Sequence, residues 1–452
     1  MTVPATTEAV EIRLRTAVPG PRSLRYLSRQ EQRESNARTY PRRVPIAIQR
    51  AHGPYVEDVD GNVLIDFLCG AGALPLGHGH PEVVARVARQ LGEYVHGLDL
   101  PTPIKDEFTE STLSLLPDGM RDRTKVHFCG PTGANAIEAA LKLAKTHTRR
   151  SDIVSFHGGF HGSTHAAMAV SGLVGPKAVV PGRVPDVHFF PYPYCLRCPL
   201  SLNPSTCDTN CATYLRHALL DSHGGVPRPA AVLLELVQGE GGVIPATPRF
   251  AREVAQLARE LDALLIVDEV QTGYGRTGTW FAFEQYGLEP DIVVVSKAAG
   301  GIGLPVALIM YDRRLDTWEP GAHIGTFRGH QLAFAAGVAA IEVMRREDVL
   351  GNVARQGGYL CAELGRLAER HPCVAEVRGL GLMIGLEIVD PAHGRPDPAR
   401  AASIQRRALL RGLIVELGGR SDAVVRLLPP LNVTRPVVDA ALRILAEAIT
   451  ES

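Results

Sequence analysis

Residues 291–303 have the sequence Asp291-Ile-Val-Val-Val-Ser-Lys297-Ala-Ala-Gly-Gly-Ile-Gly303. The β-branched run predicts a buried strand, and the glycines predict a turn where the backbone closely approaches another group. Lysine is scarce: only six of the 48 basic residues are lysines, and Lys297 is alone in the last 275 residues. An amine at the C-terminal end of such a strand stands where α/β proteins place their chemistry, and burial would make it nucleophilic. Taken alone, a surface lysine that closes a strand explains the pattern equally well.

Between residues 125 and 300, short apolar runs alternate with longer segments of helical periodicity. This alternation predicts an α/β fold, with a mainly parallel sheet that helices cover on both faces. The expected strands lie at 126–129, 153–156, 231–236, 264–267 and 292–295, and the expected helices at 134–148 and 248–261.

Segments on either side of this region carry shorter signals. Two alternating apolar runs within residues 54–68 flank Asp60-Gly61, which predicts a β-hairpin, and a helix is expected to begin at Pro81. A long alanine-rich helix is expected over 331–346, a strand near 381–387 and a last helix over 437–449. The expected organisation is a flexible leader (1–30), an N-terminal part of a small domain (31–75), a large domain (76–328) and a C-terminal part of the small domain (329–452).

The composition is that of an ordinary globular protein, with 452 residues, 45% apolar and 21% charged residues. The formal net charge is zero, so neither nucleic acid nor an anionic membrane is expected as a partner. No apolar stretch approaches the roughly 18 to 20 residues that span a bilayer, and the N-terminus lacks the apolar core of a secretory signal. Its first 50 residues mix ten arginines with four glutamates, unlike a transit peptide. The expected location is the cytoplasm.

The eight cysteines fall into two groups. Those that stand singly in apolar surroundings are expected to be buried small hydrophobes: Cys69, Cys129, Cys361 and Cys373. Four others are closely spaced, and this spacing could bind zinc or form disulfides. An ordinary reduced loop is the alternative, because no histidine or acid reinforces the spacing, and no metal ligand is assigned. The closely spaced cysteines are Cys195, Cys198, Cys207 and Cys211.

Two glycine-containing stretches follow predicted strands. In Phe128-Cys-Gly-Pro-Thr132-Gly133-Ala134-Asn135, successive N–H groups and a threonine hydroxyl would cradle an anion at a helix N-terminus. In Phe156-His-Gly-Gly-Phe160-His161-Gly162, the aromatic side chain of Phe160 could lie flat on a planar ring. A plain strand–helix turn and a core aromatic are the alternatives.

The stretch Leu264-Leu-Ile-Val-Asp268-Glu-Val270-Gln271 is more informative. A carboxylate at the end of an apolar strand requires a cationic partner, and a protonated ring nitrogen would serve. Val270 points to the same side if the chain stays extended, and could cover a ring face. A phosphate cradle, a flat aromatic, a buried acid and a Schiff-base lysine are together the groups that hold pyridoxal phosphate.

The order of these motifs resembles the class III, or ω-amino acid, aminotransferases of fold type I over nearly the whole chain. The further matching motifs are Glu235-Leu-Val-Gln-Gly-Glu-Gly-Gly242, Asp268-Glu-Val-Gln-Thr-Gly-Tyr-Gly-Arg-Thr-Gly278 and Gly325-Thr326-Phe327. The resemblance implies a large domain with a mainly parallel sheet and a smaller α/β domain built from both ends of the chain. It also implies the cofactor pyridoxal 5'-phosphate and a homodimer that shares its active sites.

The resemblance also implies roles for individual residues. Lys297 would form the Schiff base and shuttle the substrate proton, and Asp268 would pair with the ring nitrogen. Val270 and Phe160 would sandwich the ring, Gln271 would donate to its phenolic oxygen, and Thr326 of the neighbouring subunit would bind phosphate. The remaining residues of the implied cofactor site are Thr132, Gly133, Ala134, His161 and Glu235.

Two residues bear on the substrate. In glutamate-using ω-aminotransferases a carboxylate pairs with an arginine that otherwise binds the α-carboxylate of glutamate; Glu240 and Arg426 match this pair. Further motifs, such as Phe190-Pro-Tyr-Pro-Tyr-Cys-Leu-Arg-Cys-Pro199, resemble diaminobutyrate–2-oxoglutarate aminotransferases of siderophore and secondary metabolism. The implied reaction transfers an amino group from L-glutamate to L-aspartate 4-semialdehyde.

Three alternatives stay open at this point. The chain could act on another terminal amine, such as 4-aminobutyrate, ornithine or a secondary-metabolite amine, because a few pocket residues alter the substrate. It could use the same cofactor for a racemase- or mutase-like reaction, although the Glu240–Arg426 pair suits two alternating amine substrates. A non-enzymatic scaffold that uses the cysteine cluster for partner binding is the third.

Overall fold

The computed structural model describes residues 12–182 and 184–452. Its centre is a seven-stranded sheet with the order β4-β12-β11-β10-β7-β5-β6. The five strands from β11 to β6 in that order are mutually parallel, whereas β12 is antiparallel to both of its neighbours. The strand bounds are β4 Thr124–Phe128, β5 Ile153–Phe156, β6 Val187–Phe190, β7 Ala231–Leu234, β10 Leu264–Asp268, β11 Ile292–Val295 and β12 Leu308–Asp312.

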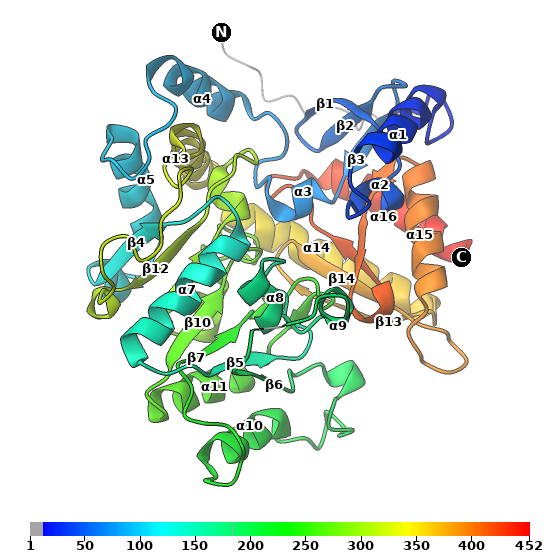
Figure 1. Cartoon of the computed structure of the whole chain (residues 1–452). Helices are drawn as coiled ribbons and strands as arrows, with labels where there is room; N and C mark the ends of the chain where they lie inside the picture. Colours follow the sequence, from blue (N-terminus) through cyan, green and yellow to red (C-terminus); the bar gives the residue numbers. More distant parts are fainter. Residues whose placement is uncertain (1–11, 183) are drawn as a thin grey trace.

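Helices cover both faces of this sheet, as Figure 1 shows. Helix α7 (Gly133–Thr148) contacts β7, β10, β11 and β12, and Ile266 and Ile292 are buried in the apolar cluster on that side. Helix α11 (Pro248–Glu260) contacts β7 and β10, and Leu265 and Val293 belong to the opposite cluster. Neighbouring residues therefore face opposite sides, as in any strand, and both sides are buried because the crossover helices pack on both.

The predicted α/β fold is confirmed, and the strands at 153–156 and 292–295 and the helix at 331–346 have the predicted bounds. One expected strand was too long: β7 ends at Leu234 rather than at residue 236. The chain leaves the sheet there because the Glu235 carboxylate accepts hydrogen bonds from the backbone of Phe160 and Gly239, which ties residue 235 to two loops.

The predicted hairpin forms part of a four-stranded sheet with the order β1-β2-β3-β15. Strands β2 and β3 pair antiparallel on either side of Asp60-Gly61, and Gly61 has φ of 85°, a value that glycine adopts without strain. Part of the leader expected to be flexible over 1–30 contacts this hairpin: Arg13 exchanges backbone hydrogen bonds with Val63, and Asp60 accepts from the N–H groups of Arg22 and Ser23. Residues 1–11 lie outside the described residues. The bounds are β1 Ile48–His52, β2 Tyr55–Asp58, β3 Val63–Asp66 and β15 Leu413–Ile414.

A second four-stranded sheet, with the order β13-β14-β17-β16, lies near the C-terminal helices. Its strands are β13 Val374–Leu380, β14 Met383–Ile388, β16 Glu416–Gly418 and β17 Val424–Leu427, and β8 Val237–Gln238 pairs separately with β9 Ile244–Pro245. The long helices of this part are α13 Gln331–Arg346, α14 Val349–Arg370, α15 Pro398–Leu410 and α16 Arg435–Thr450. The domain boundaries drawn from the sequence stay a prediction.

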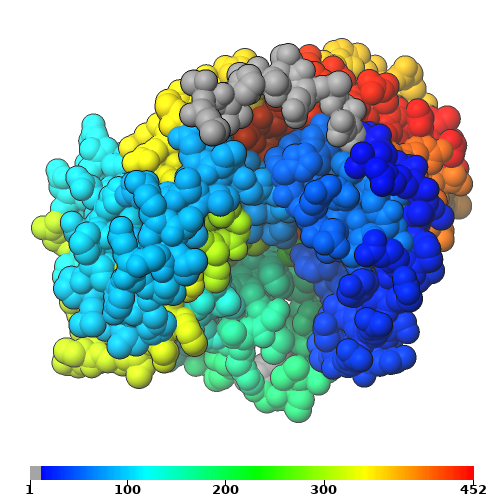
Figure 2. All heavy atoms as spheres, turned by 90° about the horizontal axis from the view of Figure 1, so that it is seen from above, coloured from blue at the N-terminus to red at the C-terminus, as the bar shows by residue number. Residues whose placement is uncertain are grey.

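The remaining helices connect these sheets or lie at the surface. Figure 2 shows the face on which the dark-blue N-terminal residues and the light-blue residues of α4 and α5 flank a hollow. No helix among the described residues is long and apolar enough to cross a bilayer. The bounds are α1 Pro21–Arg33, α2 Tyr40–Arg43, α3 Cys69–Gly72, α4 Pro81–Glu93, α5 Pro103–Leu113, α6 Asp118–Arg121, α8 His165–Val170, α9 Val174–Ala178, α10 Asn210–Leu220 and α12 Ala282–Tyr286.

Candidate active site

A cavity of about 150 Å³ lies at the carboxyl ends of the central strands. Most of the residues predicted to bind the cofactor line it, although they come from segments far apart in the sequence. Parallel strands end at one edge of the sheet, which is why residues following β4, β5, β7, β10 and β11 meet there. The lining residues are Gly133, Ala134, Phe160, His161, Gly162, Glu235, Glu240, Asp268, Val270, Gln271 and Lys297.

Lys297 is the second residue after β11 and has φ of 44°, in the left-handed region that non-glycine residues seldom adopt. Such strain persists only where the surrounding structure enforces it, and it concentrates at functional sites. Burial lowers the pKa of Lys297 below its ordinary value, and the carboxylate of Glu240 offsets part of this effect. The amine is thereby poised to be neutral more often than a surface lysine, as a nucleophile requires.

Asp268 ends β10 with 5% of its surface exposed. Its Oδ2 lies 2.8 Å from Nδ1 of His161, and its Oδ1 accepts the N–H of Val270 at 3.0 Å. These contacts fix the orientation of the carboxylate, and the Asp268 side chain still borders the cavity. A fixed, buried carboxylate favours a cation in front of it. His161 stands where the sequence placed it in the site, but its contact with Asp268 was not foreseen.

The anion cradle forms at the N-terminus of α7. Thr132 is the N-cap, and its side chain accepts from the N–H of Asn135, so its hydroxyl oxygen is already engaged. Gly133 and Ala134 line the cavity at the positive end of a 16-residue helix, where an anion is stabilised. A Cβ at residue 133 would lie 3.0 Å from Cγ1 of Val270, which is tighter than most Cβ contacts. Glycine at this position therefore avoids crowding the Val270 side chain.

Phe160, Val270 and Gln271 complete the cavity wall. Phe160 and Val270 are both half-buried. Gln271 donates from Nε2 to the carbonyl of Ala71 at 3.0 Å. This bond holds the amide at the wall of the cavity, and the second hydrogen on Nε2 is left for the predicted donation to a phenolic oxygen.

Arg426 on β17 has no exposed side-chain surface. Its Nη2 lies 2.8 Å from Oε1 of Glu240, and the same nitrogen forms an ion pair with Glu416. Attraction to both carboxylates outweighs burial and raises the pKa of Arg426. Burial alone would raise the pKa of Glu240, but attraction to Arg426 and Lys297 and the hydrogen bond with Arg426 together lower it. The pair predicted from the sequence is therefore formed, and Glu240 also borders the cavity that contains Lys297.

Sequence reasoning missed Glu416 and Tyr40 at this pair. Glu416 stands opposite Arg426 in the pairing of β16 with β17, and Tyr40 donates to its Oε1 at 3.3 Å. The strand register that brings them together cannot be inferred from the residues alone. Thr326, by contrast, is exposed and does not line the cavity in the single chain.

The four closely spaced cysteines border one cavity of about 110 Å³, beside Tyr192 and Tyr194. All four are free thiols. Among the described residues, no group of three or more metal-ligand atoms that lie within 4.8 Å of one another includes the sulfur of any of these four cysteines. Whether these cysteines bind zinc or form disulfides, which the sequence left open, thus remains untested.

A family model described as aminotransferase class-III matches residues 37–449. The chain belongs to the class-III aminotransferases. This membership confirms the family inferred from the motifs and the fold expected of it, and it accounts for a lysine, an acid and an anion cradle around one cavity.

Known relatives agree with this assignment. The aminotransferase is 50% identical over 432 residues to a diaminobutyrate–2-oxoglutarate aminotransferase of Rhizobium meliloti (strain 1021), covering 94% of this chain and 92% of the relative. It is 42% identical to a protein of that name from Haemophilus influenzae, covering 94% and 95%. A solved amine transaminase from an uncultivated Pseudomonas species, in its PLP-bound form, superposes with a TM-score of 0.83 at 28% identity, covering 93% and 98%.

Proposed function

We propose that this aminotransferase transfers an amino group from L-glutamate to L-aspartate 4-semialdehyde, giving L-2,4-diaminobutyrate and 2-oxoglutarate. The cofactor is pyridoxal 5'-phosphate, and the residues present fit it. Gly133 and Ala134 offer helix N-terminal N–H groups for its phosphate, Asp268 offers a fixed carboxylate for its ring nitrogen, and Lys297 offers an amine. When bound, the cofactor supplies an electron sink for the bond pair released at the substrate carbon.

The chain's own residues position and move protons. Asp268, oriented by His161, holds the proton on the ring nitrogen. Lys297 lies in the same cavity and, with its lowered pKa, can take the proton from the substrate Cα and return it to a neighbouring carbon. Phe160 and Val270 wall the cavity and limit the approach of water.

One observation carries the choice of a glutamate-using reaction: a buried arginine pairs with a carboxylate that borders the cavity. Nε and Nη1 of Arg426 have no hydrogen-bond partner among residues 12–182 and 184–452. A guanidinium with unused donors is suited to bind a carboxylate bidentately once Glu240 turns aside. With an ω-amine in the site, Glu240 stays on Arg426 and presents no unpaired charge.

The names of the relatives support diaminobutyrate as the ω-amine. Relatives with 50%, 42% and 39% identity, each matched over more than nine-tenths of this chain, are diaminobutyrate–2-oxoglutarate aminotransferases by name. A solved ornithine aminotransferase from Toxoplasma gondii shares the fold at only 26% identity. The higher identity to the diaminobutyrate enzymes therefore favours diaminobutyrate over the longer diamine ornithine.

We extend the proposal to a homodimer. Thr326 lies on an exposed loop flanked by apolar side chains, with Ile324 72% and Phe327 60% exposed. The N–H of Gly97 donates to the carbonyl of Gly329, so this loop adjoins the segment that carries Leu98 and Leu100, both also exposed. Exposed apolar side chains on adjoining segments are typical of a protein interface, and Thr326, which lies between Ile324 and Phe327, would reach a partner's site.

The test is a direct assay of purified holoenzyme. Glutamate alone should convert the cofactor spectrum to that of the aminated form, and aspartate semialdehyde should convert it back with formation of diaminobutyrate. Succinate semialdehyde and glutamate 5-semialdehyde serve as competing acceptors. A kcat/KM for either competitor above that for aspartate semialdehyde would overturn the substrate, whereas no spectral response to glutamate would overturn the whole proposal.

A further inference from the structure

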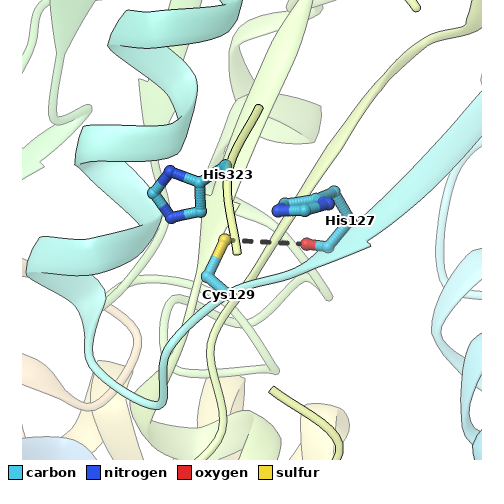
Figure 3. A group of neighbouring side chains, drawn as sticks. All are labelled: His127, Cys129 and His323. Atoms are coloured by element: carbon cyan, nitrogen blue, oxygen red, sulfur yellow. Dashed lines mark hydrogen bonds between the residues drawn. The ribbon is translucent and has the colours of Figure 1, made fainter. Parts of the chain in front are cut away.

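Outside the active site, two imidazoles and a thiol face one another. His127 and Cys129 lie on and just after β4, two residues apart and hence on one side of an extended chain, and His323 comes from the loop before α13. One ligand atom from each of the three lies within 4.8 Å of the others, and Figure 3 shows the three side chains around a common space.

This group contains an unsatisfied polar atom. Nε2 of His127 is buried and has no hydrogen-bond partner among the described residues. A neutral imidazole ring has one nitrogen that carries a hydrogen and one that carries a lone pair, and the lone pair can bind a metal ion. A buried ring nitrogen without a partner destabilises the fold. A bound ion would remove this cost.

We propose that His127, Cys129 and His323 form a site for one Zn²⁺ ion. Two imidazole nitrogens and one thiolate are the ligand types that zinc prefers, and three protein ligands leave a fourth tetrahedral position for water or a small anion. Around zinc the ligand atoms lie about 3.3–3.7 Å apart, so the three side chains would draw together by about 1 Å. Binding breaks the Cys129 S–H bond, forms a zinc–sulfur bond and releases the proton to solvent.

The charges around the group are compatible with this ion. Arg328 is the nearest cation that acts on Cys129, but it forms an ion pair with Asp99 and donates to the carbonyl of His323. Lys142 donates to the carbonyl of Ala322. The thiolate formed on binding cancels one of the two charges of zinc, so the net charge added to the site is one.

The proposed zinc site would connect two segments beside the cofactor site, namely the chain that leads into the anion cradle and the loop that carries Thr326. Cys129 immediately precedes the cradle that begins at Gly130, and Oδ1 of Asn135 accepts both from the N–H of Gly130 at 2.7 Å and from Nε2 of His323 at 2.9 Å. His323 stands three residues before Thr326. Zinc at this position would therefore fix the loop that carries Thr326 against the cradle.

The experiment measures zinc binding to chelator-treated holoenzyme. Equilibrium dialysis against Zn²⁺ should give one site that Cys129→Ser and His323→Ala each weaken at least about 10-fold. Cys373→Ser, a buried cysteine in the other part of the chain, is the matched control and should bind like the wild type. X-ray absorption of the ion bound at one equivalent should show one sulfur at about 2.3 Å and nitrogens at about 2.0 Å.

Two results would overturn the site. A first zinc ion with two or more sulfur neighbours would place it at Cys195, Cys198, Cys207 and Cys211 instead. Unchanged zinc binding in folded His323→Ala, a variant of a half-buried loop residue, would exclude the group even if Cys129→Ser fails to fold. Neither result depends on which amine the enzyme uses, because zinc is counted without turnover.

Discussion

Nη2 of Arg426 lies 2.8 Å from Oε1 of Glu240 and also contacts Glu416, so one buried guanidinium is shared between a carboxylate at the cavity and one behind it. The two carboxylates differ in their surroundings. Glu240 is 31% exposed and its pKa is lowered, whereas Glu416 is 7% exposed and burial raises its pKa despite Arg426. Glu240 is the more exposed partner and borders the cavity, and we propose that it leaves Arg426 when a substrate carboxylate binds while Glu416 stays in contact.

Arg426→Lys should impair the glutamate half-reaction most. Lysine keeps the charge but loses the planar fork that binds a carboxylate bidentately. The expected loss is about 2–4 kcal/mol, roughly 30- to 1,000-fold in rate. The half-reaction of the 4-amino group of diaminobutyrate should change much less. Single-turnover rates check this, with exposed Arg346→Lys as the control. Equal losses in both half-reactions would contradict the proposal that Glu240 turns away from Arg426 for only one of the two substrates.

Lys297→Ala should abolish both turnover and the visible absorbance that the cofactor acquires on attachment to the protein. The reason is that no other lysine lines the cavity of the described chain. Lys145→Ala, on the far end of α7, is the control and should retain both. Absorbance spectra and a steady-state assay suffice, and a near-normal rate in Lys297→Ala would rule out the assigned role.

Asp268→Asn should slow the chemical step by about 100-fold or more, because a neutral amide no longer holds the proton on the ring nitrogen. Circular dichroism should show an intact fold, since asparagine can still accept from Val270 and contact His161. Exposed Asp262→Asn is the matched control. A rate within about twofold of the wild type would show that another acid acts on the cofactor.

Thr326→Ala should weaken cofactor retention through the partner's site rather than its own. Mixing Thr326→Ala with Lys297→Ala subunits should then restore activity, because one hybrid site has both Lys297 and a partner's Thr326 intact. Activity after subunit exchange, verified by mass spectrometry, is the measurement. Persistent inactivity of verified hybrids would argue against a shared phosphate site.

Glu235 should make stability depend on pH. Burial raises its pKa from 4.5 to about 7. Between those values the folded protein retains a proton that the unfolded chain has lost, so this residue's contribution to stability falls as pH rises from about 4.5 to 7. Glu235→Gln should reduce this loss in the free energy of unfolding by up to about 3 kcal/mol. The measurement is urea unfolding of cofactor-free protein at pH 5 and 7.5.

The control for this experiment is Glu342→Gln, an exposed glutamate on α13, which should leave the slope unchanged. Burial also raises the pKa of Glu269 to about 7. Part of the pH dependence of stability should therefore remain in Glu235→Gln. A steeper slope in Glu235→Gln than in the wild type would contradict the sign of the effect.

The sequence by itself determined the strand–helix alternation, the family, and the identity of the cavity residues. These follow from local patterns: β-branched runs, helical periodicity, and motifs such as Asp268-Glu-Val-Gln271 that stand at fixed strand ends. Parallel strands bring such ends to one edge whatever the details of packing, so Lys297, Asp268 and Gly133 meet as predicted.

Only the tertiary structure decided the contacts made across sheets and loops. Glu416 opposes Arg426 through a strand register, His161 contacts Asp268 across a gap of 107 residues, and His323 reaches Cys129 from a loop nearly two hundred residues away. Arg13, Arg22 and Ser23 likewise bond to a hairpin, although the composition of this part of the chain suggested a flexible leader. Such pairings arise from shape and burial over the whole chain, and no local pattern of residue types records them.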